Sequence, residues 1–212
     1  EQGWEPLAIT LFAQKREGEE AIKRLGEKRN EALQGARDII AEWISESMDV
    51  RGGLRNQYVR YGRIVAKVAK GVDEQSDEAL KFKNYFEFSE DMSRIPSHRV
   101  LAILRGASEG ILSLKVEVDG ERSMDSIYRS VLKGKRSPAP DVAEQLDMAV
   151  EDSYKRLLHP SIENESLKII KEKADIESIK VFGENLRQLL MAPPLGQKRV
   201  LAIDPGFRTG CK

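Results

Sequence analysis

The sequence predicts a mainly α-helical protein with a small β component. Apolar side chains recur at spacings of three and four residues along much of the chain, which is the period at which a helix buries one face. Charged residues make up 33% of the 212 residues and aromatic residues only 6%, which is typical of soluble, helix-rich proteins. Strand-like segments are limited to 63–69, 111–118 and 199–204. We therefore expect a multi-helical region with two short internal strands and one C-terminal strand.

Helices are predicted first, at the beginning of the chain. A short helix covers 5–13, and a polar one covers 14–30 with a break around Gly26. The stretch 32–46 is more clearly amphipathic, because its apolar residues recur at three and four while its acidic residues fall elsewhere. A pair of glycines interrupts the pattern, and another short helix is predicted at 54–61.

The middle of the chain alternates between strands and helices. The strand at 63–69 is followed by a polar loop at 73–78 and by the densest aromatic cluster of the chain, 82–88, which we interpret as core. A helix at 96–105 precedes the strand at 111–118, which alternates apolar and polar residues and ends at an Asp-Gly turn. The two strands are candidates for pairing with each other.

Helices resume in the second half. Segments 123–133 and 141–158 are separated by a flexible basic connector at 133–140. Residues 161–191 are predicted to be helical, with Asp175 as a candidate cap of a second helix after a break. A pair of prolines ends this region.

Charge and cysteine content bound the function. Lys and Arg number 35, and so do Asp and Glu, so any nucleic-acid role must rest on a local patch rather than on net charge. The single cysteine, Cys211, excludes a disulfide framework within one chain and fits a reducing, cytoplasmic location. No run approaches the roughly 18 apolar residues of a membrane helix, so no membrane partner is expected. Because the chain begins with Glu1 and ends in a strand that would open a domain, we expect a piece of a longer protein.

One local patch stands out between 51 and 72, where basic residues occur without any acid. Tyr58 and Tyr61 are interleaved with them, and cations with aromatic rings can neutralise phosphates and stack on bases. The alternative is a solvated surface balanced by acids from elsewhere, such as 73–77. A smaller basic stretch consists of Arg129, Lys133, Lys135 and Arg136. The candidate nucleic-acid-binding residues are Arg51, Arg55, Arg60, Arg63, Lys67 and Lys70.

Asp204 is the one candidate for metal chemistry. A carboxylate after a buried strand and before Pro-Gly can be a turn residue, or it can be one Mg²⁺ ligand of a nuclease. One carboxylate cannot hold such a site alone. His98 and His159 have no Cys or His at ligand spacing, so we interpret both as structural. We therefore predict no complete catalytic site, no metal site and no cofactor in this chain.

Several longer motifs together resemble one family, the bacterial transcription accessory protein Tex. They cover nearly the whole chain, and no simple pattern of helix caps or periods would generate them. The motifs are 35–42 (GARDIIAE), 81–86 (KFKNYF), 95–102 (IPSHRVLA), 159–163 (HPSIE), 185–196 (NLRQLLMAPPLG) and 203–212 (IDPGFRTGCK).

This resemblance implies an organisation. Residues 1–195 would be the central helical region of a Tex-like protein, and 196–212 the start of a truncated YqgF-type, RNase H-like domain. Asp204 matches the first acidic position of RNase H-like folds, although the family is generally regarded as lacking an intact nuclease site. Much of the family's nucleic-acid affinity is attributed to a C-terminal barrel that lies outside this chain.

The resemblance also implies a function. We expect a non-enzymatic helical scaffold that positions the nucleic-acid-binding domains of a cytoplasmic factor, which binds RNA or DNA and is linked to the RNA polymerase machinery. One alternative is part of a Mg²⁺-dependent nuclease in which Asp204 is one metal ligand. Another is a pure spacer that has no ligand of its own.

Overall fold

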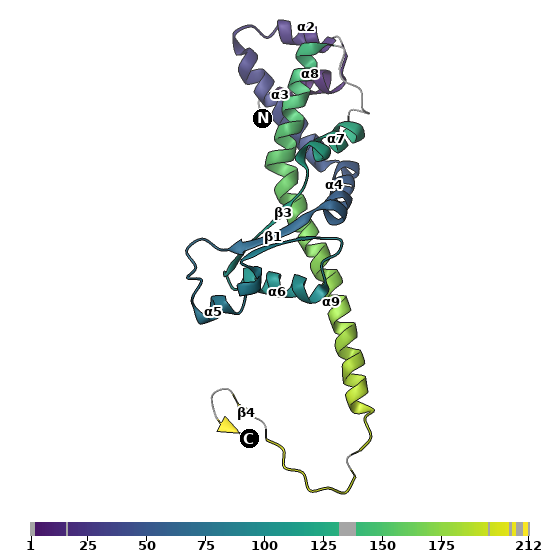
Figure 1. Cartoon of the computed structure of the whole chain (residues 1–212). Coiled ribbons are helices and arrows are strands. Elements are labelled where there is room, and N and C mark those ends of the chain that lie inside the picture. Colours follow the sequence, from purple (N-terminus) through teal and green to yellow (C-terminus); the bar gives the residue numbers. More distant parts are fainter. Residues whose placement is uncertain are drawn as a thin grey trace. The chain divides into compact units, whose positions relative to one another are not determined.

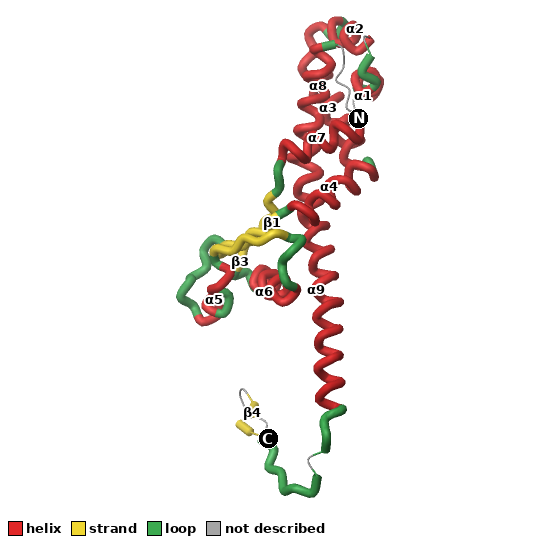
Figure 2. The backbone as a smooth tube through the Cα atoms, turned by 45° about the vertical axis from the view of Figure 1, so that its right-hand side comes forward, coloured by secondary structure: helices red, strands yellow, loops and turns green. Residues whose placement is uncertain are grey.

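The computed structural model describes residues 3–15, 17–131, 139–194, 196–203, 205–206 and 210–211. The chain divides into two compact units, Glu1–Glu177 and Ser178–Lys212, which are described separately. Helices dominate the described residues, with one small antiparallel sheet in the first unit (Figures 1 and 2). The predicted mainly α fold class is confirmed.

Two predictions were wrong here, because one helix runs through the glycine pair at 52–53, where a break was expected, and another begins within the expected polar loop at 73–78. Apart from these, the helices follow the predicted apolar stripes, with adjusted ends. They are α1 Glu5–Phe12, α2 Glu17–Lys23, α3 Arg29–Glu46, α4 Met48–Tyr61, α5 Asp77–Leu80, α6 Ser97–Ser108, α7 Gly120–Val131, α8 Pro140–Asp152 and α9 His159–Leu190. Two short 3₁₀ turns, η1 Gly26–Lys28 and η2 Lys83–Tyr85, and a π-helical turn, η3 Ser153–Leu158, complete the helical elements of the described residues. Because η3 joins α8 to α9 without a break, three elements run on as one helix (Figure 1).

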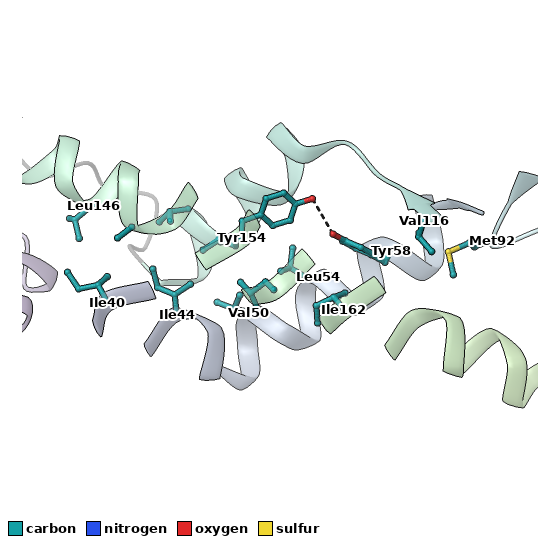
Figure 3. Close-up of a cluster of buried hydrophobic side chains, with 14 of the residues drawn as sticks. Ile40, Ile44, Val50, Leu54, Tyr58, Met92, Val116, Leu146, Tyr154 and Ile162 are labelled. Atoms are coloured by element: carbon teal, nitrogen blue, oxygen red, sulfur yellow. Dashed lines mark hydrogen bonds between the residues drawn. The ribbon is translucent and has the colours of Figure 1, made fainter. Parts of the chain in front are cut away.

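The core of the first unit is built where α3, α4, α8 and the first part of α9 meet. Ile40 and Ile44 of α3 face Leu146 of α8, and Ile162 of α9 lies near Leu54 of α4 (Figure 3). All five side chains are essentially inaccessible to water. Removing each from water stabilises the fold by about 1.5–3 kcal/mol, so these helices are held together mainly by their apolar faces.

The sheet contains the strands in the order β2-β1-β3. Its strands are β1 Arg63–Val68, β2 Glu87–Asp91 and β3 Leu112–Glu117. The predicted pairing of the two internal strands is confirmed, with Ala66 of β1 opposite Leu114 of β3. Alternate residues of β1, including Ile64 and Ala66, are buried, and α6 packs against β3 (Figure 2). The aromatic cluster at 82–88 supplies both core residues and the start of β2, which the sequence did not predict as a strand.

Two local predictions about the second half were wrong. The expected break before Asp175 does not occur, because α9 is continuous and Asp175 instead pairs with Lys171 at 2.6 Å. The strand expected at 199–204 is absent from residues 199–203, whose apolar side chains Val200 and Leu201 are exposed. A strand needs a partner to satisfy its backbone groups, and no described strand pairs with these residues. Strand structure appears just afterwards, as the short antiparallel pair β4 Pro205–Gly206 and β5 Gly210–Cys211.

Candidate nucleic-acid interface

The six basic residues of the run 51–70 do not gather on one face. Arg51 and Arg55 are four residues apart on α4 and therefore share a face, whereas Arg60 is five residues further on and points elsewhere. Arg63 and Lys67 lie on β1, and Lys70 lies in the turn that follows. The local fold thus divides the run into separate groups.

Arg51 and Arg55 hold Glu165 of α9. Arg55 donates from Nε and Nη2 to Oε2 of Glu165 at 3.0 and 2.7 Å, and Arg51 donates to Oε1. Arg51 also bonds the hydroxyl of Ser161 at 2.6 Å. Partial burial by itself would raise the pKa of Glu165, but the hydrogen bonds from Arg55 and Arg51 outweigh it and hold the pKa below its ordinary value. These two arginines therefore join α4 to α9.

Arg63 and Lys67 lie on a sheet face that also carries acids. Nη1 of Arg63 is 3.5 Å from a carboxylate oxygen of Asp91, and the register places Arg63 opposite Glu117 as well. Lys67 is paired in register with Glu87. The ion-paired residues of the run find their acids on β2, for Arg63, and on α9, for Arg51 and Arg55, rather than in 73–77.

A different set of basic residues converges between α4 and α7. Arg60 meets Arg122 and Arg129 around a cavity of about 320 Å³, which we call the α4–α7 pocket. No acidic residue is among the described residues that line it. The lining residues are Gly53, Asn56, Gln57, Arg60, Tyr61, Arg122, Ser126, Arg129 and Ser130.

The spacing of α7 and its close approach to α4 build this pocket. Arg122, Ser126 and Arg129 follow one another at four and three residues, so they share a face of α7. Below them Ser123 is fully buried, and its hydroxyl accepts a 3.0 Å hydrogen bond from Nε2 of Gln57. This buried bond fixes the face of α7 that carries the arginines against α4.

Two of the three guanidinium groups of the pocket lie against an aromatic ring rather than against acids. The guanidinium carbon of Arg122 lies 4.1 Å from the ring centre of Tyr61, and that of Arg60 lies 5.4 Å from it. Within the part of the chain that the structure describes, none of the three pocket arginines is within 4.0 Å of a carboxylate oxygen. Asp125, four residues before Arg129, is exposed and does not line the pocket.

The sequence indicated two of the three pocket arginines as basic candidates, but it did not predict that they meet. Arg60 belongs to the predicted basic run, and Arg129 to the smaller basic stretch. Arg122 was missed, although its spacing to Ser126 and Arg129 on an amphipathic helix was a usable signal. The other members of the smaller stretch, Lys133, Lys135 and Arg136, lie outside the described residues.

The remaining candidates are the two histidines and Asp204. Nδ1 of His159 lies 2.7 Å from the hydroxyl of Tyr58, which fits its predicted structural role. His98 is exposed at the start of α6. No group of three or more His, Cys, Asp or Glu residues able to hold a metal ion occurs among the residues described, and Asp204 lies outside them. No helix in the described ranges is long and apolar enough to cross a membrane.

Comparison with known proteins assigns most of this chain to one protein family. The family model described as Tex central region-like matches residues 19–182. The chain belongs to this family, as its motifs indicated.

Individual relatives agree with this assignment. The chain is 40% identical over 184 residues to uncharacterized protein YdcI of Bacillus subtilis, covering 87% of this chain and 25% of that protein. It is 34% identical to the transcriptional accessory protein Tex of Neisseria gonorrhoeae, over all of this chain and 28% of that protein. It is 32% identical to the human S1 RNA-binding domain-containing protein 1, over 84% of this chain and 18% of that protein. The chain thus spans about a quarter or less of the length of these relatives.

Proposed function

We propose that this chain is a helical scaffold within a longer Tex-family protein that binds nucleic acid. One observation carries the proposal. The last turns of α9, from Ser178 to Leu190, are exposed throughout, yet they carry an apolar stripe. This stripe is the surface on which another part of the longer protein would pack.

The stripe has the period of a packing face. Ile179, Phe182, Leu186 and Leu190 follow one another at three and four residues and are 71%, 66%, 42% and 75% exposed. Neighbouring exposed apolar side chains of this size mark interaction surfaces. Because the chain spans only about a quarter or less of its relatives' length, the rest of the same polypeptide is the natural occupant.

The other end of α9 is anchored within the first unit. Ile162, Ile170 and Ala174 are buried there, and Glu165 is held by the two arginines of α4. Glu163 adds a contact to the sheet, because its Oε1 accepts a 2.6 Å hydrogen bond from the backbone N–H of Val116. One continuous helix would therefore link a packed core to the domain that covers the stripe.

The nucleic-acid part of the proposal rests on the names of the relatives, one of which is an S1 RNA-binding domain-containing protein. The role of the run 51–70 stays a prediction. Within it, the described residues Arg60, Lys67 and Lys70 have no carboxylate within 4.0 Å. The RNA polymerase partner, the cytoplasmic location, the YqgF-type assignment of 196–212 and the nuclease alternative through Asp204 also stay predictions.

The scaffold proposal is tested by hydrogen–deuterium exchange across residues 178–190. We expect these amides to exchange slowly in a full-length Tex-family protein carrying this sequence, and faster in the chain alone. Ile179→Asp should abolish the protection, since it removes apolar burial worth about 1.5–3 kcal/mol and buries a charge.

Val181 provides a matched control. It is also β-branched and 50% exposed, but it lies about 160° from Ile179 and about 100° from the nearest stripe residue, Phe182, around the helix. Val181→Asp should leave the protection intact. Equal protection of 178–190 in the chain alone and in the full-length protein, or equal loss in both variants, would contradict the proposal.

A further inference from the structure

We infer that the α4–α7 pocket binds a backbone phosphate of single-stranded nucleic acid through Arg60, Arg122 and Arg129. The inference rests on the proposed function, in which the longer protein binds nucleic acid. It places one contact in this helical region, at residues that come from two elements far apart in the sequence.

The first step of the argument is charge. Arginines elsewhere in the first unit are commonly matched by a carboxylate, as Arg55 is by Glu165 and Arg99 is by Glu90. The three pocket arginines converge without such a partner among the described residues. Like charges that are brought together raise the free energy of the fold unless an anion neutralises them. The pocket is therefore an arrangement that an anion would stabilise.

The second step is the kind of anion. A guanidinium group is a planar fork whose donors match the oxygens of a phosphate, and several such forks suit a phosphate better than a single carboxylate. The amide of Asn56 and the hydroxyl of Ser126 add uncharged donors around the same cavity, whereas the hydroxyl of Ser130 donates to the carbonyl of Ser126 at 3.0 Å. A cavity of about 320 Å³ has room for a phosphate with part of its sugar.

The third step is why the phosphate would belong to a single strand. Tyr61 is half exposed at the pocket, with the guanidinium of Arg122 stacked against its ring. Arginine planes and tyrosine rings are surfaces on which unpaired bases stack, and a base within a duplex is not free to do so. A phosphate site next to such a surface fits a strand whose bases are splayed out.

The test measures binding of the full-length protein to a fluorescent single-stranded RNA at several salt concentrations. The triple variant Arg60→Gln/Arg122→Gln/Arg129→Gln should lose roughly tenfold or more in affinity at about 50 mM salt. Its plot of log affinity against log salt should also be shallower, by about 0.7 for each phosphate that the variant no longer neutralises.

A second triple variant controls for net charge. Lys81, Arg94 and Lys115 are exposed in the same unit and have no carboxylate within 4.0 Å among the residues described. Changing these three to Gln removes the same charge, and it should lower the affinity less than twofold. Equal losses in the two triples would overturn the inference in favour of diffuse electrostatics.

Further outcomes are separable. If the unmodified protein binds RNA and the pocket triple binds equally well, the pocket inference fails while the proposed function stands. If the unmodified protein binds neither RNA nor DNA, both fail. A pocket that prefers inorganic phosphate or a phosphopeptide to the oligonucleotide, judged by competition, would also overturn the nucleic-acid assignment.

A single variant covers the case in which circular dichroism shows that the triple variant misfolds. The exposed change Arg129→Gln must then still lower the affinity and its salt dependence, or the inference is wrong.

Discussion

Glu165 on α9 accepts hydrogen bonds from Arg55 on α4, which lies 110 positions earlier in the chain. Arg51 approaches the other oxygen of the same carboxylate, so two bases share one acid as their counter-charge. The contact explains why a run of basic residues without local acids can belong to a stable fold. It also makes the junction between α4 and α9 sensitive to pH.

Glu165→Gln should destabilise the protein at neutral pH by about 1–2 kcal/mol, because two partly buried arginines lose their counter-charge. The pKa of Glu165 is lowered in the folded state, so its contribution is present above its ordinary value of 4.5 and is lost as pH falls through the folded value. Urea unfolding should therefore show a difference between variant and parent that shrinks in acid. Glu172→Gln, on an exposed site of the same helix, is the control. A difference that stays constant with pH would refute the role of the charge.

Tyr58→Phe should destabilise the protein by about 1–3 kcal/mol, although it removes only one oxygen. The hydroxyl of Tyr58 lies 3.2 Å from the hydroxyl of Tyr154 (Figure 3). It also lies 2.7 Å from Nδ1 of His159. Burial raises the pKa of Tyr58, with help from the hydrogen bond to Tyr154, so the group is neutral at ordinary pH. Tyr85→Phe is the control, because Tyr85 is only partly buried, and it should change the free energy of unfolding much less. Equal effects would mean that the buried network contributes little.

Gly106→Ala should destabilise the protein although alanine favours helices. A Cβ at position 106 would lie 2.7 Å from Cδ1 of Leu112 and 3.0 Å from Cδ1 of Phe82, both buried side chains, so α6 would be pushed away from the sheet. Such overpacking costs about 1–3 kcal/mol. Gly52→Ala on α4 has nothing within 4 Å of the new methyl and should stabilise by about 0.5–1 kcal/mol. Thermal unfolding of the pair should therefore shift in opposite directions, and parallel shifts would contradict the packing argument.

Two buried serines should respond oppositely to alanine. The hydroxyl of Ser166 on α9 is buried without a hydrogen-bond partner among the described residues, so Ser166→Ala should be neutral or stabilise by up to about 1 kcal/mol. The hydroxyl of Ser123 accepts from Gln57 and donates to the carbonyl of Asp119 at 2.9 Å. Ser123→Ala should therefore cost about 1–3 kcal/mol. Chemical denaturation of both variants checks the prediction, and a clear loss for Ser166→Ala would reveal a partner for its hydroxyl.

Local sequence patterns predicted most helices and strands well. The signals for them, amphipathic periodicity and helix-breaking residues, depend only on residues a few positions apart. The stripe of 32–46, the strand at 63–69 and its pairing with 111–118 all came from such signals. The continuity of α9 at Asp175 was missed, since a capping residue can equally form an ion pair within a helix. β2 was missed because aromatic residues that enter a core hide the alternation of apolar and polar residues by which a strand is recognised, and β2 is too short to show it otherwise.

The candidate site was less predictable, because it depends on which distant residues meet. The sequence showed the basic residues but not that Glu165 would engage Arg51 and Arg55. In the sequence, all three strands of the sheet and α6 lie between Arg60 and Arg129, and only the packing of α4 on α7 brings these two arginines to one cavity. Runs of charged residues therefore indicated which residue types lie on the surface. Tertiary contacts decided which of these charges are paired within the fold and which remain available to a ligand.

The π-helical turn η3 sets the rotational phase of everything that follows it. A residue in an α-helix advances about 100° around the axis, and a π turn accommodates an extra residue within the same helix. Deleting one residue from Ser153–Leu158 would rotate α9 by about 100° relative to α8. Glu165 would then turn away from Arg51 and Arg55, and Ile179 would change the direction it presents to a partner. The directions in which Glu165 and Ile179 point therefore depend on the number of residues in η3, independently of the chemistry of those residues.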